Sequence, residues 1–194
     1  MHSGFLALVL VALSIYVAVL IYRNSDMFQL KCVISSVDSN TYCVRDRERI
    51  GEAADLLAHN TKKMRTLVQH VGKRHPEKDN IRRLVAGFNP SKIVETLPTS
   101  EHTAYSENKG EKLAFCLQKH KNESALIDQN TLFFVSMHEL AHIATVSIGH
   151  TEEFWRNFKM LIEESVNAGL YQPVDYSKQP APYCGMTLTD NPAF

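Results

Sequence analysis

The chain has 194 residues, which is enough for one membrane segment and one compact domain of ordinary size. Its 21 Lys and Arg residues balance its 21 Asp and Glu residues, so no overall field gathers polyanions and no nucleic-acid partner is expected. Hydrophobic residues make up 44% of the chain, which excludes a wholly disordered protein, and the four scattered cysteines contain no C-x-x-C pair that would indicate a zinc ribbon.

The N-terminal segment predicts a membrane anchor. Residues 5–22 read FLALVLVALSIYVAVLIY, without a charged residue, Gly or Pro. At about 1.5 Å per residue, a helix of this length spans most of a hydrocarbon core of about 30 Å. A cleaved signal peptide is the alternative, but no basic region precedes the segment and no small-residue cleavage site follows it. We expect residues 1–23 to be a transmembrane anchor that contacts the lipid bilayer through residues 5–22.

The charges beside this segment predict its orientation. Only His2 and the amino terminus precede it, whereas Arg23, Lys31 and Arg45 follow it. The positive-inside tendency therefore predicts that the C-terminal domain faces the cytoplasm.

A cytoplasmic domain is expected to keep its cysteines reduced. The alternative is a disulfide between Cys32 and Cys43, which are close enough in sequence to close a short loop. The sequon Asn122-Glu123-Ser124 would be usable only in the opposite orientation.

Two regions precede the candidate site. Residues 24–44 read as a juxtamembrane segment with a short strand at 28–34, and residues 45–194 read as the folded domain. Apolar residues recur at helical spacing from about residue 45 to residue 71, and a shorter helix is expected at 80–86. Both helices are expected to support the site by packing.

Residues 103–118 predict a β-hairpin around a polar turn at 107–110. An exposed hairpin edge can hold an extended peptide by main-chain hydrogen bonds, and the alternative is an ordinary sheet strand.

A helix expected over residues 126–145 carries the motif His138-Glu139-Leu140-Ala141-His142. The i, i+4 spacing places His138 and His142 on one face, about one turn apart, where both imidazoles can reach a single ion. Glu139 points about 100° round the helix, where it can take a proton from water that a metal activates. The apolar neighbours predict a mostly buried helix, in which these polar groups would be costly without partners. The alternative is a helix with two exposed or singly hydrogen-bonded histidines.

A catalytic zinc site needs a third protein ligand, and His150 is the preferred residue. It follows His142 by eight positions, about 12 Å further along an unbroken helix, so the chain must turn back. Gly149 permits such a turn, and Thr151 is a suitable N-cap for a following helix to about residue 168.

Glu163 and Glu164 are competing third ligands. They lie 21 and 22 positions beyond His142, near the spacing at which thermolysin-like enzymes place a glutamate. The alternative for both residues is a solvated helix face.

HELAH followed by GHTEEFW resembles the WLM and SprT-like minimal zinc peptidases, in which HExxH is followed by a His and an aromatic pair. The resemblance covers roughly residues 100–160. It implies an α+β zincin-like fold whose small sheet has an edge beside the motif helix. It also implies Zn2+ held by His138, His142 and His150, with Glu139 as the catalytic base. The gap before the third His is longer than the group leads one to expect, and the chain lacks the basic character of DNA-repair members, so no DNA-repair role is carried over.

The combination of a membrane anchor with this peptidase-like domain is similar to that of proteins encoded by large DNA viruses. This resemblance implies a location in the virion inner membrane or the minor capsid. We expect zinc-dependent hydrolysis of peptide bonds in a protein substrate. The alternative is a structural virion or membrane scaffold protein that keeps the peptidase fold and binds an assembly partner. That alternative predicts a site that is empty, capped by the tail or buried against a partner.

The C-terminal tail at 174–186 is dense in Pro and aromatic residues and can fold back over the cleft. Tyr176 or Tyr183 would then donate a hydrogen bond to a developing oxyanion. The alternative is an ordered tail that packs on the domain.

Overall fold

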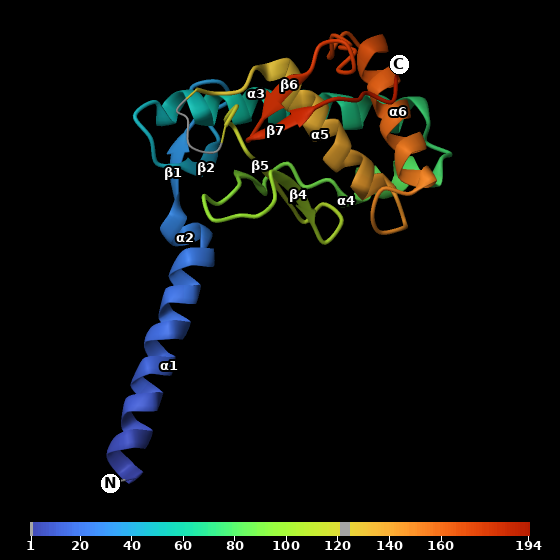
Figure 1. The fold of residues 1–194 in the computed structure, drawn as a ribbon. Helices are drawn as coiled ribbons and strands as arrows, with labels where there is room; N and C mark the ends of the chain where they lie inside the picture. The colour runs from blue at the N-terminus through green and yellow to red at the C-terminus, as the bar shows by residue number, and fades with distance from the viewer. Residues whose placement is uncertain (1, 121–124) are drawn as a thin grey trace.

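Helix α1 (His2–Asn24) leads into a domain of mixed helices and strands (Figure 1). The computed structural model describes residues 2–120 and 125–194. Among these residues, the segment Gly4–Arg23 is the one helix long and apolar enough to cross a membrane, and a signal sequence would pass the same test. Its apolar side chains are exposed on all sides, which suits a helix surrounded by hydrocarbon.

The junction between α1 and the domain is short and hydrogen-bonded. Helix α2 (Asp26–Gln29) follows α1 almost directly. Gln29 Nε2 donates to the carbonyl of Tyr22 at 3.1 Å, and Thr99 Oγ1 donates to the carbonyl of Arg23 at 2.8 Å. These bonds hold the domain immediately beside the end of α1.

Strands β1 (Leu30–Ile34) and β2 (Thr41–Arg45) form an antiparallel hairpin where the sequence predicts a juxtamembrane segment. The hairpin packs against helix α3 (Ile50–Arg74). Its turn is tied to that helix by the Ser35 hydroxyl, which donates to the Asp55 carboxylate at 2.6 Å. The hairpin therefore packs as part of the domain.

Arg45, at the end of β2, is buried. Its guanidinium donates to the carbonyl of Thr96 at 2.8 Å and to the side-chain oxygen of Gln118 at 3.0 Å, and its backbone N–H donates to Glu95 at 2.7 Å. Glu95 also forms an ion pair with Arg47. The charge of Arg45 is therefore balanced inside the fold, and Arg45 does not flank the membrane segment as a free cation. One of the three charges from which the orientation of the membrane segment was predicted is thereby lost.

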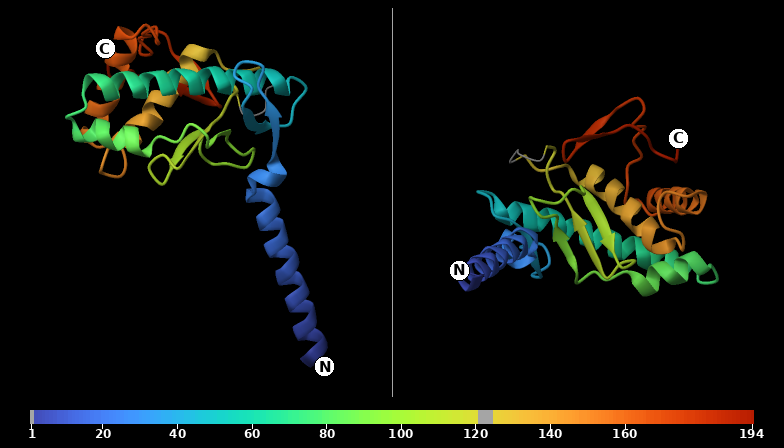
Figure 2. Two further views of the ribbon diagram at one scale, coloured as in Figure 1. Left: turned by 180° about the vertical axis from the view of Figure 1, so that it is seen from behind. Right: turned by 60° about the horizontal axis from the view of Figure 1, so that its bottom comes forward.

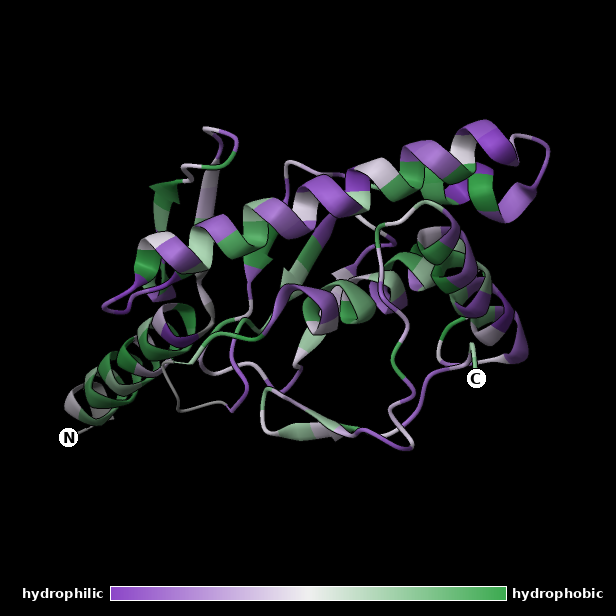
Figure 3. Ribbon diagram, turned by 90° about the horizontal axis from the view of Figure 1, so that it is seen from above, coloured by the Kyte–Doolittle hydropathy of each residue, from purple (hydrophilic) through white to green (hydrophobic). Residues whose placement is uncertain are grey.

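Helix α3 has the predicted amphipathic character, but it begins at Ile50 because Arg45 belongs to β2. It ends at Arg74, two residues before Pro76, since a proline disfavours helical conformation in the residue that precedes it. One face is hydrophilic and the other packs on the domain (Figure 3). Helix α4 (Asp79–Gly87) follows close to its predicted bounds.

A small sheet is formed by β3 (Ile93–Glu95), β4 (Ala104–Glu107) and β5 (Lys112–Phe115) in the order β3-β5-β4. The antiparallel pair β4–β5 confirms the predicted hairpin, whereas the parallel strand β3 was not predicted. Among the described strands, β4 has no partner on its outer side.

The β4–β5 turn packs directly on the end of α4. Gly110 has a φ of 108°, in the left-handed region, and a Cβ at this position would clash with the carbonyl oxygen of Gly87. In the reverse direction, a Cβ on Gly87 would lie 2.7 Å from the carbonyl oxygen of Lys109. The close approach of these two backbones requires glycine at both positions.

Gly110→Ala is therefore expected to lower the free energy of unfolding by more than about 2 kcal/mol, because the clash adds to the cost of a positive φ. Chemical denaturation of the full-length protein in detergent measures this change. Gly51→Ala is the matched control, since Gly51 lies in the first turn of α3 with open space around it, and we expect no loss of stability there. Equal effects of the two changes would contradict the prediction.

Helix α5 (Gln129–Ala144) passes through the centre of the domain, and α6 (Glu152–Asn167) packs against it (Figure 2). Asp128 caps α5 by accepting a hydrogen bond from the Thr131 backbone N–H at 2.9 Å. Most of its side chains are buried, as predicted for residues 126–145. The mixed α+β architecture with a small sheet is confirmed.

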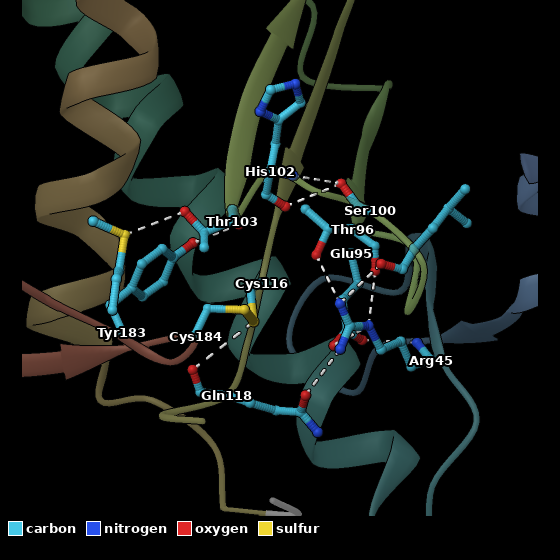
Figure 4. The surroundings of a disulfide bond; sticks show 12 residues. Arg45, Glu95, Thr96, Ser100, His102, Thr103, Cys116, Gln118, Tyr183 and Cys184 are labelled. Carbon is cyan, nitrogen blue, oxygen red and sulfur yellow. Dashed lines mark hydrogen bonds and ion pairs between the residues drawn. A yellow bond between two sulfur atoms is a disulfide. The ribbon is translucent and has the colours of Figure 1, made fainter. Parts of the chain in front are cut away.

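The C-terminal tail forms a short hairpin of β6 (Ala181–Tyr183) and β7 (Met186–Leu188). A disulfide joins Cys116, just after β5, to Cys184 in the turn of this hairpin (Figure 4). The Cys184 backbone N–H donates to the carbonyl of Gln118 at 2.9 Å. The tail is thus ordered and is joined to the domain by a disulfide and a main-chain hydrogen bond.

Both cysteine pairs are disulfide-bonded, so the expectation of reduced thiols is wrong. The β1–β2 register places Cys32 opposite Cys43, and the tail brings Cys184 to Cys116. Disulfides persist mainly in oxidising compartments, which counts against the predicted cytoplasmic placement of the domain. The sequon Asn122-Glu123-Ser124 lies outside the described residues.

Candidate metal centre

Three histidines meet at one side of α5. His138 and His142 come from the helix itself, and His150 comes from the loop between α5 and α6. One ring nitrogen from each lies within 4.8 Å of the others, and the Nε2 atoms of His150 and His138 are 3.0 Å apart. The structure therefore brings together all three residues that the sequence suggests as zinc ligands.

The return of the chain to His150 depends on local signals that the sequence contains. Helix α5 stops at Ala144, and Gly149 adopts a φ of 83° with no atom near its missing Cβ. The Thr151 side chain then caps α6 by accepting from the backbone N–H of Phe154. The turn therefore redirects the loop so that His150 faces the two helical histidines.

An acidic side chain of α6 holds this loop from one side. The Glu153 carboxylate accepts hydrogen bonds from the backbone N–H groups of Val146 at 3.1 Å and Ser147 at 3.3 Å. Arg83 of α4 lies 3.3 Å from the same carboxylate and also donates to the carbonyl of Ala144 at 3.0 Å. The hydrogen bond from Val146 is the main cause of the lowered pKa of Glu153. The carboxylate of Glu153 thus ties the loop to α6 and, through Arg83, to α4.

A basic side chain holds the loop from the other side. Lys109, in the β4–β5 turn, extends its Nζ to three carbonyl oxygens at the end of α5: those of His142 at 3.2 Å, Thr145 at 2.8 Å and Ser147 at 3.0 Å. A cation at a helix C-terminus is favourable because the last carbonyls lack partners. The contact joins segments 33 or more residues apart, so no local pattern reveals it.

Lys109→Met is expected to lower the free energy of unfolding by about 1 kcal/mol, because three carbonyl groups lose their hydrogen bonds to the Lys109 ammonium group. It is also expected to weaken zinc binding about 10-fold, because the loop that carries His150 is held less firmly. Denaturation and chelator competition measure the two effects. Lys92→Met, which removes an exposed lysine near β3, is the control. If both variants bind zinc as tightly as the unchanged protein, Lys109 does not position the loop.

An aromatic ring forms the floor of the triad. The ring centroid of Phe154 lies 4.8 Å from that of His138, 4.4 Å from His142 and 4.7 Å from His150. Burial and the neighbouring imidazoles lower the pKa of His138 to about 3 and that of His142 to about 4. These two imidazoles are therefore neutral near pH 7, which is the form that binds metals.

Glu139 lies beside the triad and is 5% exposed. Burial raises the pKa of its carboxyl to about 8. A carboxyl whose pKa lies near neutrality can both accept and release a proton under ordinary conditions, as a general base or acid must.

An open cleft of about 520 Å³ lies between β4 and the triad. One wall is formed by Ala104, Tyr105 and Ser106 of β4, and the other by the three histidines and Glu139. The unpartnered edge of β4 thus runs along the cleft, as the resemblance implies.

The two competing ligands lie elsewhere. The Glu164 carboxylate faces α3, where it contacts His75 Nε2 at 2.8 Å and His70 Nε2 at 3.1 Å. It is 8% exposed, so the solvated-face alternative is wrong for this residue. Glu163 is exposed beside Val166, near the end of α6. Neither glutamate joins the triad.

Neither tail tyrosine is among the residues that line the larger cleft. Tyr176 packs on Phe134, with ring centroids 4.8 Å apart, and its hydroxyl is near Thr131, two turns before the motif. Tyr183 is closer, because it lines a smaller cavity next to Glu139, but its hydroxyl donates to the carbonyl of Thr103 at 3.1 Å. The position of Tyr176 does not suit the predicted oxyanion role, and the hydroxyl of Tyr183 is already engaged.

No protein-family model matches the chain. An uncharacterized protein of Acanthamoeba polyphaga mimivirus is 28% identical over 187 residues, which cover 93% of this chain and 94% of that protein. An uncharacterized protein of Invertebrate iridescent virus 3 is 35% identical over 86 residues, covering 44% of this chain and 50% of that protein. An uncharacterized protein of Invertebrate iridescent virus 6 is 39% identical over 57 residues, which cover 29% of this chain and 32% of that protein. These three relatives are viral.

Among solved structures, Wss1 from Saccharomyces cerevisiae is similar over 65% of this chain and 88% of that chain, with 18% identity and a TM-score of 0.46. A Wss1 mutant from S. pombe is similar over 62% of this chain and 91% of that chain, with 20% identity and a TM-score of 0.42.

Proposed function

We propose that this protein is a membrane-anchored, zinc-dependent endopeptidase of the WLM and SprT-like type. The observation that carries the proposal is the convergence of His138, His142 and His150 in an open cleft, with Glu139 beside them and a free strand edge opposite. The family assignment rests on the HELAH and GHTEEFW motifs.

The chemistry of the donor set fits zinc. Three imidazole nitrogens within 4.8 Å match the three protein ligands of a catalytic zinc site, and the open cleft leaves room for the fourth position. Structural zinc sites are instead closed and usually cysteine-rich, whereas all four cysteines here form disulfides. When bound, zinc supplies a Lewis acid that polarises a carbonyl and lowers the pKa of water.

The remaining chemistry belongs to the chain's own residues. The Glu139 carboxylate takes a proton from the attacking water and returns it to the departing amine. The outer edge of β4, which borders the cleft, holds an extended substrate by main-chain hydrogen bonds. Phe154 keeps water away from the underside of the triad.

The cleft lies on the side of the domain from which α1 projects. The β4–β5 hairpin and the α5–α6 loop both lie on this side in opposite views (Figures 1 and 2). If α1 spans a bilayer, protein substrates near the membrane surface reach the cleft most readily. A virion inner-membrane or capsid location stays a prediction, and the viral relatives support the viral setting.

The scaffold alternative predicts a site that is empty, capped by the tail or buried against a partner, and the position of the tail bears on the second of these. The tail instead forms a wall at one side of the triad, and the cleft of about 520 Å³ is open. This arrangement favours the peptidase over a structural role for the site.

Removal of the metal tests the proposal. The full-length protein in detergent, loaded with zinc, is expected to cleave an unfolded model protein, and a zinc chelator is expected to stop cleavage while the fold persists by circular dichroism. Restoring zinc should restore cleavage, because the two disulfides and the core hold the domain together without it. Cleavage that survives complete removal of zinc would overturn the proposal.

A further inference from the structure

A second cavity, of about 150 Å³, lies between α5 and the C-terminal hairpin. Phe134 and Val135 of α5 form its inner wall, and Tyr183 of β6 with Met186 and Leu188 of β7 forms its outer wall. Most of its lining residues are therefore apolar, and Thr103, His138 and Glu139 add polar groups at its border with the larger cleft.

This cavity is continuous with the candidate metal centre. Ala104, His138 and Glu139 line both the larger cleft and the smaller cavity. A peptide held along β4 with its reacting carbonyl at the triad would therefore place a neighbouring side chain at the mouth of the cavity.

The outer wall is held in a fixed position. The Tyr183 hydroxyl donates to the carbonyl of Thr103 at 3.1 Å, and the Thr103 hydroxyl contacts the sulfur of Met186 at 3.5 Å. The Cys116–Cys184 disulfide lies beside Tyr183 (Figure 4). The hairpin is thus a rigid wall, in which the side chain of Met186 is 46% exposed.

The size and lining of the cavity select its occupant. An apolar cavity of about 150 Å³ accepts a benzene-sized group, which corresponds to a Leu, Met or Phe side chain. An acidic side chain would lose its hydration there and would also meet the carboxyl group of Glu139.

We propose that the disulfide-fastened hairpin β6–β7 forms a specificity subsite beside Glu139, which selects a mid-sized apolar side chain next to the cleaved bond. This subsite rests on the proposed peptidase function, because it is defined by the position of a substrate at the triad. Met186 and Leu188 are its specificity-determining residues.

Peptide hydroxamates test the subsite without requiring turnover, because they bind zinc and are not hydrolysed. Four probes that differ in one side chain, Leu-like, Phe-like, Ala-like and Asp-like, are titrated against the zinc-loaded full-length protein in detergent. We expect the Leu-like probe to bind about 10-fold or more tightly than the Ala-like probe, and the Asp-like probe to bind most weakly.

Two variants and a control assign the preference to the hairpin. Leu188→Trp fills the cavity and should remove the advantage of the Leu-like probe. Met186→Ala, at a half-exposed position that tolerates change, should widen the cavity and shift the preference toward a Phe-like probe. Ile34→Trp, an enlargement at a position of β1 that is 72% exposed, should leave the order unchanged. Equal binding of all probes, or an order that neither hairpin variant alters, would overturn the subsite.

Cleavage of matching peptides separates this proposal from the peptidase itself. If the protein binds the Leu-like probe preferentially but cleaves no peptide, the proposed peptidase function is refuted and the selectivity of the subsite is supported. Cleavage by the unchanged protein without side-chain preference would support the peptidase and refute the subsite. Failure to bind zinc would overturn both proposals.

Discussion

Replacing His150 by alanine is expected to weaken zinc binding more than about 100-fold while the domain stays folded. One of three converging imidazoles would be lost, which should cost more than the 10- to 100-fold typical of residues that only orient a ligand. His150 is an exposed loop residue, so its removal leaves no cavity in the core. Zinc content after dialysis and chelator competition measure the change in the full-length protein.

Glu164→Gln is the matched control for this experiment. The Glu164 carboxylate lies between α6 and α3, at His70 and His75, and the change keeps the size of the side chain. Zinc binding should therefore be unchanged. A His150 variant that binds zinc normally, or a Glu164 variant that loses it, would show that the ligand set is different.

Glu139→Gln is expected to keep zinc and lose about 10²- to 10⁴-fold in the rate of peptide hydrolysis. The amide fills the same buried space but cannot take a proton from water. The rate of cleavage of an unfolded protein, measured together with zinc content, separates the loss of a base from the loss of the metal.

Glu163→Gln serves as the control for this second prediction, since Glu163 is an exposed carboxyl on α6 that lies outside the cleft. Its cleavage rate should match that of the unchanged protein. Full activity in the Glu139 variant would remove that residue from the mechanism.

The elements that rest on local signals could be predicted from the sequence. The i, i+4 spacing of His138 and His142 and the apolar residues around them define α5 and one side of the site. Gly149 and Thr151 mark the turn that returns His150 to the triad, because a left-handed residue and an N-cap are both readable in sequence.

The parts that depend on distant contacts could not be predicted. Lys109 and Glu153 position the loop of His150 from two different elements. Lys109 lies in no motif, and the GHTEEFW motif that contains Glu153 does not reveal that its carboxylate binds the loop. The pairing of Cys116 with Cys184 spans 68 residues and required the position of the tail. Arg45 was counted as a flanking charge, yet its charge is balanced by a carboxylate that lies fifty residues away in the chain.

X-ray absorption at the zinc edge tests the central claim most directly. The zinc-loaded full-length protein should show three imidazole nitrogens and one exchangeable oxygen ligand, which is the pattern of an open catalytic site. The Glu139→Gln variant should give the same nitrogen shell. A sulfur ligand, a closed shell of four protein ligands, or fewer than three imidazoles would contradict the account.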